Sequence, residues 1–106
     1  MFDNGLSGPV PESLGGLAHL RELSLRDNQL TGELPASLGN LTALEQLWLR
    51  GNTGLSGALP LSLVNLTNLR TLDLRDTGLC APRDSSFQEW LDGVDSQRGV
   101  FTCPAS

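Results

Sequence analysis

Leucines recur along the chain at a nearly constant spacing. The step from Leu6 to Leu30 is 24 residues, and so is the step from Leu55 to Leu79. Further leucines align at this period in the columns Leu14, Leu38 and Leu63; Leu17, Leu41 and Leu66; Leu20, Leu44 and Leu69; Leu23, Leu47 and Leu72; and Leu25, Leu49 and Leu74. The pattern predicts a stack of similar units, with one residue inserted near Thr53-Gly54 in a turn, where insertions are tolerated.

Short segments at residues 21–25, 45–49 and 70–74 alternate leucine with polar side chains. Alternation with a period of two is typical of a strand with one buried face. We therefore predict one strand in each unit, with its leucines pointing into the stack.

An asparagine follows the strand position at Asn4, Asn28 and Asn52. Its amide can donate to and accept from backbone groups that a turn leaves unpaired, so we predict a structural ladder. Thr77 stands at the same place in the last unit, which fits a final coil with no further coil to bond.

Proline follows in register at Pro11, Pro35 and Pro60, and proline suits the first turn of a short helix. Each unit is therefore predicted to run from strand to turn to short helical segment.

Residues 25–41, which read LRDNQLTGELPASLGNL, resemble the plant-specific class of leucine-rich repeat, and the full pattern runs three times between residues 4 and 79. The resemblance implies an α/β solenoid with a right-handed coil. It also implies a parallel sheet on the concave face, a second short sheet from the Leu-x-Gly-x-x-Pro stretch, and short helical turns on the convex face. Members of this family bind proteins, peptides or glycans and are not catalysts, although a fold alone never fixes the ligand.

The pattern stops after Leu79, so we predict leucine-rich repeats over residues 1–79, one partial and three full, and a C-terminal cap over residues 80–106. Ser86-x-x-Glu89 is a capping-box pattern that predicts the start of a helix. Phe87, Trp90 and Leu91 then share one helical face, and we expect Trp90 to pack in the core.

Cys80 and Cys103 bracket this cap and are the chain's two cysteines. A disulfide between them is the natural pairing, and two buried free thiols are the alternative. The Leu79-Cys80-Ala81-Pro82 start, together with Trp90 and Cys103, resembles the caps of bacterial and algal proteins that carry plant-type repeats.

At the other end, Met1 and Phe2 stand where Leu25 and Arg26 stand one unit later, and no cysteine-paired cap precedes them. We expect either a fragment of a longer protein or an open edge covered by a partner chain. Because an uncovered strand edge invites pairing, a homodimer through this end is one candidate.

The polar residues that alternate with the strand leucines should form columns on the concave sheet. The predicted binding residues are Glu22, Ser24, Arg26, Gln46, Trp48, Arg50, Thr71, Asp73 and Arg75. The column of Arg26, Arg50 and Arg75 also includes Phe2, and an edge column holds Asp3, Asp27, Gly51 and Asp76. Stacked arginines would repel one another unless acids lie beside them, and Asp27, Asp73, Asp76 and Glu22 are the expected partners.

These columns could be a solvated salt-bridge network or a ligand surface. A large aromatic such as Trp48 at the centre of a polar face favours the ligand surface, because Trp and Arg are frequent anchors of interfaces. The sequence therefore predicts a recognition module for a protein or peptide. A glycan or cell-wall polymer on the same face is an alternative, with Trp48 stacking on a sugar ring.

Charge and hydropathy narrow the classes of partner. The net charge is -5, with seven arginines, no lysine and twelve acids, which argues against binding nucleic acid or an anionic membrane. No apolar run reaches the roughly 18 residues of a transmembrane helix, and we expect no membrane insertion. Met1 leads into Phe2-Asp3-Asn4-Gly5 without an apolar signal segment, although we expect an extracellular or cell-surface parent protein.

Catalysis, cofactors and metals have little support. The one histidine, His19, lies off the concave columns and is expected on the surface, and Asp73 and Asp76 lie on one open strand. One histidine and two distant cysteines do not make a metal-ligand set. We therefore expect no enzyme activity, no cofactor and no metal.

Asn40-Leu41-Thr42 and Asn65-Leu66-Thr67 match the N-glycosylation acceptor pattern. They also match the Gly-Asn-Leu-Thr step of the repeat, so they have a structural explanation as well. Glycosylation of Asn40 and Asn65 requires a secretory setting.

Overall fold

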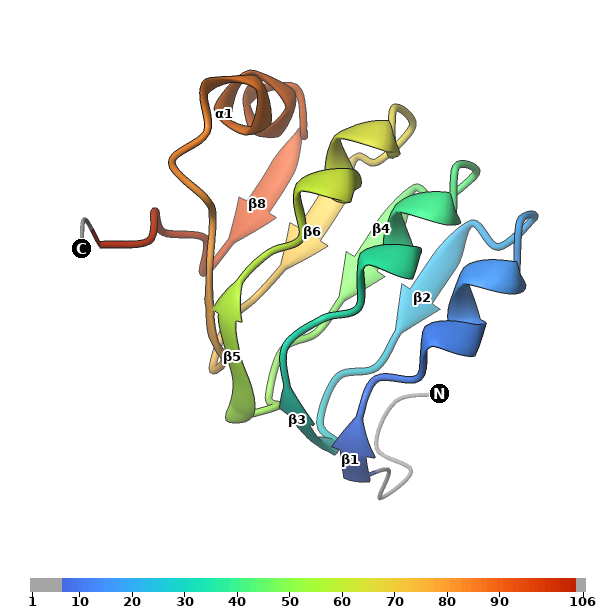
Figure 1. Cartoon of the computed structure of the whole chain (residues 1–106), viewed down its shortest axis with the longest axis vertical. Coiled ribbons are helices and arrows are strands. Elements are labelled where there is room, and N and C mark those ends of the chain that lie inside the picture. The colour runs from blue at the N-terminus through green and yellow to red at the C-terminus, as the bar shows by residue number, and fades with distance from the viewer. Residues whose placement is uncertain (1–6, 105–106) are drawn as a thin grey trace.

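The computed structural model describes residues 7–104, which wind into successive coils of similar shape (Figure 1). The strands form two parallel sheets, one in the order β1-β3-β5-β7 and the other in the order β2-β4-β6-β8. The first sheet is built from β1 (Ser7–Pro9), β3 (Gln29–Gly32), β5 (Gly54–Ala58) and β7 (Gly78–Cys80). The second is built from β2 (Glu22–Ser24), β4 (Gln46–Trp48), β6 (Thr71–Asp73) and β8 (Ser96–Arg98). The predicted α/β solenoid, including the second short sheet, is confirmed.

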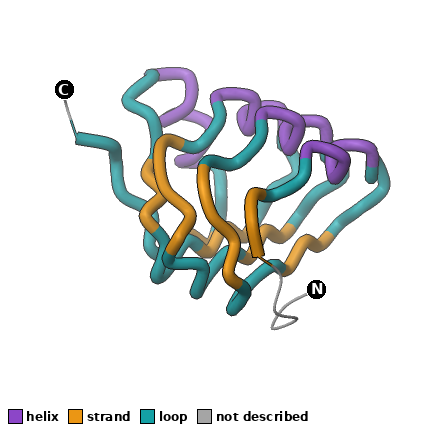
Figure 2. Tube along the Cα trace, turned by 60° about the horizontal axis from the view of Figure 1, so that its bottom comes forward, coloured by secondary structure: helices purple, strands orange, loops and turns teal. Residues whose placement is uncertain are grey.

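Three short helices gather along one side of the solenoid, away from the β2-β4-β6-β8 sheet (Figure 2). They are η1 (Glu12–Gly16), η2 (Ala36–Asn40) and η3 (Leu61–Asn65), and all three are 3-10 helices. Their prolines differ from the prediction, because Pro11, Pro35 and Pro60 precede the helices in extended conformations. The carbonyl of each proline accepts a hydrogen bond from the leucine three residues later, which closes the first tight turn.

The leucine columns fill the space between the sheets and the helices. Leu38, Leu47 and Leu66 represent three of these columns, and each is 0% exposed. Since every coil places its leucines over those of the next, the core is one continuous apolar stripe along the stack.

The predicted asparagine ladder is confirmed. The Asn52 side-chain amide donates to the carbonyls of Leu25 and Leu49, at 2.8 Å and 2.9 Å, and its oxygen accepts from the Leu30 amide at 3.2 Å. Asn28 donates to the Leu25 carbonyl at 2.8 Å. Thr77 bonds within its own coil, to the carbonyl of Leu74 and the amide of Leu79. Asn4 lies outside the described residues.

The inserted residue lies in a turn, as predicted. The Leu55 amide donates to the Asn52 carbonyl at 3.0 Å, which closes a turn around Thr53-Gly54 at the start of β5. The ladder and the sheet on either side therefore keep their register.

A helix and a further strand follow the last repeat. Helix α1 (Ser85–Asp92) buries Phe87 and Leu91, and the Trp90 indole donates to the Leu66 carbonyl at 3.0 Å. The predicted packing of these three side chains is confirmed. The predicted capping box is wrong, because the helix begins two residues earlier than Ser86 and Glu89 implied: the Asp84 carboxylate accepts from the Phe87 amide at 3.0 Å.

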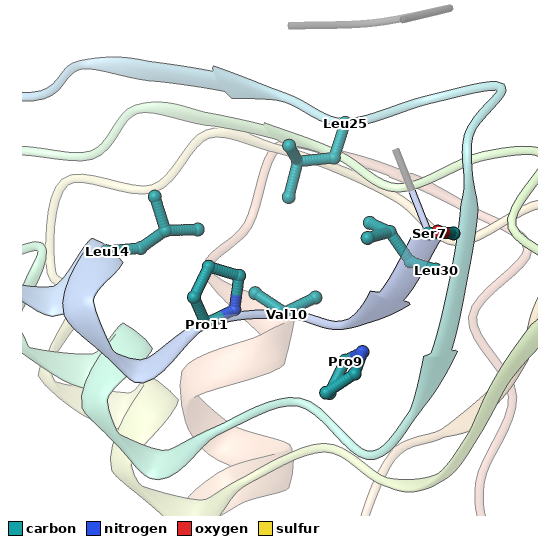
Figure 3. A pocket seen from close by; sticks show the side chains of 7 residues that line it. All are labelled: Ser7, Pro9, Val10, Pro11, Leu14, Leu25 and Leu30. Carbon is teal, nitrogen blue, oxygen red and sulfur yellow. The ribbon is translucent and has the colours of Figure 1, made fainter. Parts of the chain in front are cut away.

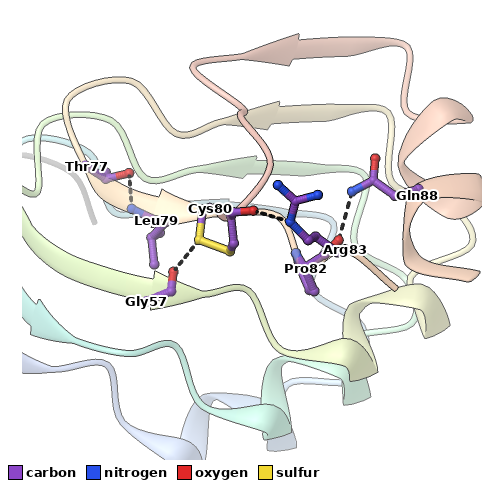
Figure 4. The surroundings of a disulfide bond; sticks show 8 residues. Gly57, Thr77, Leu79, Cys80, Pro82, Arg83 and Gln88 are labelled. Carbon is purple, nitrogen blue, oxygen red and sulfur yellow. Dashed lines mark hydrogen bonds between the residues drawn. A yellow bond between two sulfur atoms is a disulfide. The ribbon is translucent and has the colours of Figure 1, made fainter. Parts of the chain in front are cut away.

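The predicted disulfide between Cys80 and Cys103 is confirmed, with their Cα atoms 4.9 Å apart (Figure 4). Around it, the Arg83 guanidinium donates to the Cys103 carbonyl, and the Gln88 amide donates to the Pro82 carbonyl. The first bond joins the two ends of the cap to each other, and the second links helix α1 to the segment that follows β7.

An apolar pocket of about 210 Å³ opens at the N-terminal end of the described stack (Figure 3). Its lining includes the side chains of Val10, Leu14, Leu25 and Leu30. In the same first coil, Leu17 after η1 is 48% exposed, whereas its column partners Leu41 and Leu66 are 0% exposed. None of the predicted binding residues lines this pocket.

Candidate binding surface

The outward side of the β2-β4-β6-β8 sheet carries the predicted columns, and we call it the strand face. The register pairs Glu22 with Gln46 and Gln46 with Thr71. It also pairs Ser24 with Trp48 and Trp48 with Asp73. The predicted alignment of these residues is therefore confirmed, while Phe2 and Asp3 lie outside the described residues.

Sequence reasoning missed the fourth strand of this face. β8 pairs with β6, so Ser96 continues the column of Thr71 and Arg98 continues the column of Asp73. The leucine pattern did not predict this strand, because Gln97 occupies the place that Leu23, Leu47 and Leu72 hold in the other strands. Its side-chain amide instead donates to the carbonyls of Leu91 and Val94, which ties the strand to helix α1.

Trp48 lies half-buried at the centre of the strand face. Its indole N–H donates to the Gln46 side-chain oxygen at 3.2 Å, and the Arg26 guanidinium carbon lies 5.8 Å from the ring centroid. This distance suits a cation–π contact, which holds the ring in place. Beside it, the Ser24 hydroxyl is buried and has no hydrogen-bond partner among the described residues.

Asp73 differs from its predicted position on the solvent-facing surface, because its side chain is 1% exposed. The Arg75 side chain reaches back from the turn after β6 and donates to both carboxylate oxygens, at 3.0 Å and 2.8 Å. The Arg75 backbone amide donates to the same carboxylate at 3.1 Å. Burial raises the pKa of Asp73, but the hydrogen bonds from Arg75 and the charges of Arg75 and Arg50 outweigh burial and lower that pKa below its usual value.

The bond to Asp73 also raises the pKa of Arg75, so both groups stay charged near neutral pH. The pair therefore forms a rigid, internally satisfied unit in the surface. The Asp73 carboxylate is buried, and the Arg75 guanidinium is already hydrogen-bonded to it.

The predicted network of acids around the arginines is smaller than expected. Between residues 7 and 104, the strand face contains one ion pair, Arg75 with Asp73, and the pair of Arg21 with Glu45 lies at its edge at 3.9 Å. Asp27 and Asp76 instead occupy turn positions with φ of 59° and 58°. Short polar side chains tolerate this left-handed conformation, so these acids mark the turns after β2 and β6, while Gly51 takes the same conformation after β4.

Two arginines of the strand face are not engaged in this way. Arg50 is half-buried and Arg98 is exposed, and neither guanidinium has a hydrogen-bond or ion-pair partner within the described part of the chain. Arg50 follows β4, the strand that carries Trp48, and Arg98 lies on the edge strand β8, so both add positive charge to the strand face of an acidic chain. Such a surface can take an acidic or aromatic group of a partner.

The histidine and the two asparagines of the glycosylation pattern lie away from the strand face. His19 is exposed beside the helical side, and Asn40 and Asn65 are exposed at the ends of η2 and η3. The described residues hold no cluster of side chains suited to a metal ion. They also contain no helix with the length and hydropathy of a membrane span.

The family model described as leucine-rich repeats (2 copies) matches residues 18–62. Among solved structures, the plant peptide hormone receptor RGFR1 in complex with RGF2 is similar with a TM-score of 0.78 and 28% identity. The ectodomain of the receptor kinase SOBIR1 from Arabidopsis thaliana is similar with a TM-score of 0.74 and 30% identity. The chain is therefore similar to plant-type leucine-rich repeat proteins.

A third similar structure is the ectodomain of the plant membrane receptor kinase GASSHO1/SCHENGEN3 from Arabidopsis thaliana, in complex with CASPARIAN STRIP INTEGRITY FACTOR 2. Its TM-score is 0.76, and its identity is 35%. These matches cover 91%, 89% and 94% of this leucine-rich repeat chain for RGFR1, SOBIR1 and GASSHO1 respectively. The chain in turn spans 15%, 48% and 11% of those proteins. No curated protein matches the sequence significantly.

Proposed function

We propose that the chain is a non-catalytic recognition module that binds a protein or peptide on its strand face. The observation that carries the proposal is the central Trp48, held by Gln46 and Arg26 and accompanied by the unengaged Arg50. A half-buried tryptophan that is already fixed loses little conformational entropy when a partner covers it. Trp and Arg are also the residues that most often dominate binding energies.

The comparisons support the choice of a peptide or protein partner. RGFR1 is named as a peptide hormone receptor and was solved with RGF2, and GASSHO1/SCHENGEN3 was solved with CASPARIAN STRIP INTEGRITY FACTOR 2. Because the chain covers a small share of either receptor, we propose for it only the same class of partner, a protein or peptide.

We propose that the binding surface crosses the boundary between the repeats, residues 1–79, and the cap, residues 80–106. Strand β8 of the cap adds Ser96 and Arg98 to the face that β2, β4 and β6 begin. We also propose an extracellular or cell-surface parent protein, because the disulfide is typical of oxidising compartments and two of the similar structures belong to plant receptor kinases.

Trp48→Ala and Arg50→Glu should each weaken a bound peptide by more than about 30-fold, since loss of a binding hot spot costs at least about 2 kcal/mol. The probe is a peptide selected from a random displayed library on the intact chain, and affinity is measured by calorimetry. Neither variant should lower the melting temperature by more than a few degrees, because both side chains lie at the surface.

Two variants on the helical side serve as controls. Leu61→Ala removes an apolar side chain that is 56% exposed on η3, and Glu12→Arg on η1 reverses a charge as Arg50→Glu does. Both should bind the peptide as the parent chain does. Peptides that keep their affinity for Trp48→Ala and Arg50→Glu would show that the strand face is not the site.

Two alternatives stay predictions. A glycan would need stacking surfaces, and the described strand face offers one aromatic ring, with Arg26 close to it. A homodimer through the N-terminal end would place a second chain at the apolar pocket in Figure 3. The mass in solution at micromolar concentration tests this pairing, and a strict monomer excludes it.

A further inference from the structure

The sequons at Asn40 and Asn65 lie at the same place in two successive coils, where η2 and η3 end. We propose that both asparagines are acceptors of N-linked glycans. This modification site is independent of the ligand that the strand face binds.

Exposure and hydrogen bonding separate these two asparagines from the structural ones. Asn28 and Asn52 are 6% and 0% exposed, and their amides hold the ladder. Asn40 and Asn65 are exposed, and within residues 7–104 neither side-chain amide makes a hydrogen bond. Their amide nitrogens are therefore available for modification at no cost to the fold.

The backbone presents the whole acceptor tripeptide outward. Leu41 and Leu66, the middle residues, have φ and ψ of -83° and 62°, and of -84° and 72°. These values describe an inverse γ-turn, and the Thr67 amide donates to the Asn65 carbonyl at 3.0 Å across it. Each leucine is 0% exposed and points into the core, whereas the asparagine and threonine on either side are exposed. The repeat thus explains the leucine of the sequon but leaves the asparagine amide and the threonine hydroxyl without a structural role.

The two sites lie on the helical side of the solenoid (Figure 2). A glycan there extends from the side of the coils opposite to the strand face. Glycosylation and ligand binding can therefore coexist on one molecule.

The cap lies next to the second site. The Trp90 indole donates to the Leu66 carbonyl within the sequon, and Thr67 lines a groove of about 240 Å³ with Glu89 and Trp90. The Asn65 side chain lies outside the lining of this groove and stays exposed.

A second, independent observation points to the compartment in which this chemistry occurs. The Cys80–Cys103 disulfide forms and persists in oxidising environments such as the endoplasmic reticulum. The co-reactant there is a lipid diphosphate-linked oligosaccharide. The asparagine amide nitrogen forms a bond to the anomeric carbon of the first sugar, the bond from that carbon to the diphosphate oxygen breaks, and the amide gives up one proton as the lipid diphosphate leaves.

The test is to produce the full chain behind a cleavable secretion signal in eukaryotic cells. Both the secreted chain and the chain held in microsomes are analysed, so a variant that is not secreted still gives a result. Intact mass should show two glycans, and peptide N-glycosidase should remove both and convert Asn40 and Asn65 to aspartate. The replacements Thr42→Ala and Thr67→Ala, which keep the asparagines, should each remove one glycan, and the double variant should have none.

Asn68 is an internal control, because it is exposed on the same side but is followed by Leu69-Arg70 without a hydroxyl residue. It should stay unmodified. An unglycosylated parent chain in the microsomes would overturn the proposal. Modification at only one sequon would overturn the assignment of the other, and a glycan that survives the double threonine variant would refute both.

Discussion

Replacing Asn52 by alanine is expected to lower the free energy of unfolding by about 3 kcal/mol, because three hydrogen bonds to buried backbone groups are lost together. The Asn52 side chain is 0% exposed and joins two coils through the carbonyls of Leu25 and Leu49 and the amide of Leu30. Water does not reach these groups to replace the missing bonds. For a chain of this size the change corresponds to about 15 °C in the melting temperature, which calorimetry or urea titration measures.

The matched control is Asn68→Ala, which removes the same type of side chain from the surface. The Asn68 amide makes one exposed hydrogen bond, to the Thr42 carbonyl at 3.1 Å. Its loss should cost less than about 0.5 kcal/mol. If the two variants melt within a few degrees of each other, the ladder does not stabilise the stack.

Breaking the disulfide is expected to cost about 3 kcal/mol, because the bond closes a loop across a sequence separation of 23 residues. This loop contains helix α1 and strand β8, so the cap should loosen before the repeats unfold. The Ser96 amide donates to the Arg70 carbonyl, and the Leu74 amide donates to the Arg98 carbonyl. Hydrogen exchange at Ser96 and Leu74 should therefore accelerate in the reduced chain, while the Leu49 amide of the central coil stays protected.

The same result should follow from reductant and from Cys103→Ser, since the described chain has no free cysteine on which reductant could act. Reductant added to Cys103→Ser should have no further effect on the melting temperature. Equal exchange rates at Ser96 in the oxidised and reduced chains would show that the cap holds β8 without the disulfide. Because Arg98 lies on that strand, loosening of the cap also removes one arginine from the strand face.

Most of the fold was predictable because the spacing of the leucines shows which positions are buried. The columns of Leu23 and Leu25 set which side of each strand is buried, and the position of Asn52 after the strand indicated a side-chain ladder. The cap was less predictable. Gln97 replaces a leucine in the strand column and satisfies its amide on the Leu91 and Val94 carbonyls, which no periodic pattern reveals.

The columns of the candidate site were predictable from strand register, but the state of each side chain was not. Asp73 reads in sequence as one more exposed acid beside the arginines. Whether it is buried depends on the side-chain conformation of Arg75, two residues further on in the turn after β6. Similarly, either Asp84 or Ser86 could accept a hydrogen bond from a backbone amide in the first turn of helix α1. Asp84 is the acceptor, so the helix begins earlier.

The central claim is that a partner binds on the strand face around Trp48. The chain contains two tryptophans, Trp48 on that face and Trp90 in the cap, so its indole N–H groups give two signals in a nitrogen-15 correlation spectrum. We predict that titration with the selected peptide shifts the Trp48 indole signal and leaves that of Trp90, bonded to the Leu66 carbonyl, unchanged. A bound peptide that shifts the Trp90 indole signal and leaves the Trp48 indole signal unchanged would contradict the account.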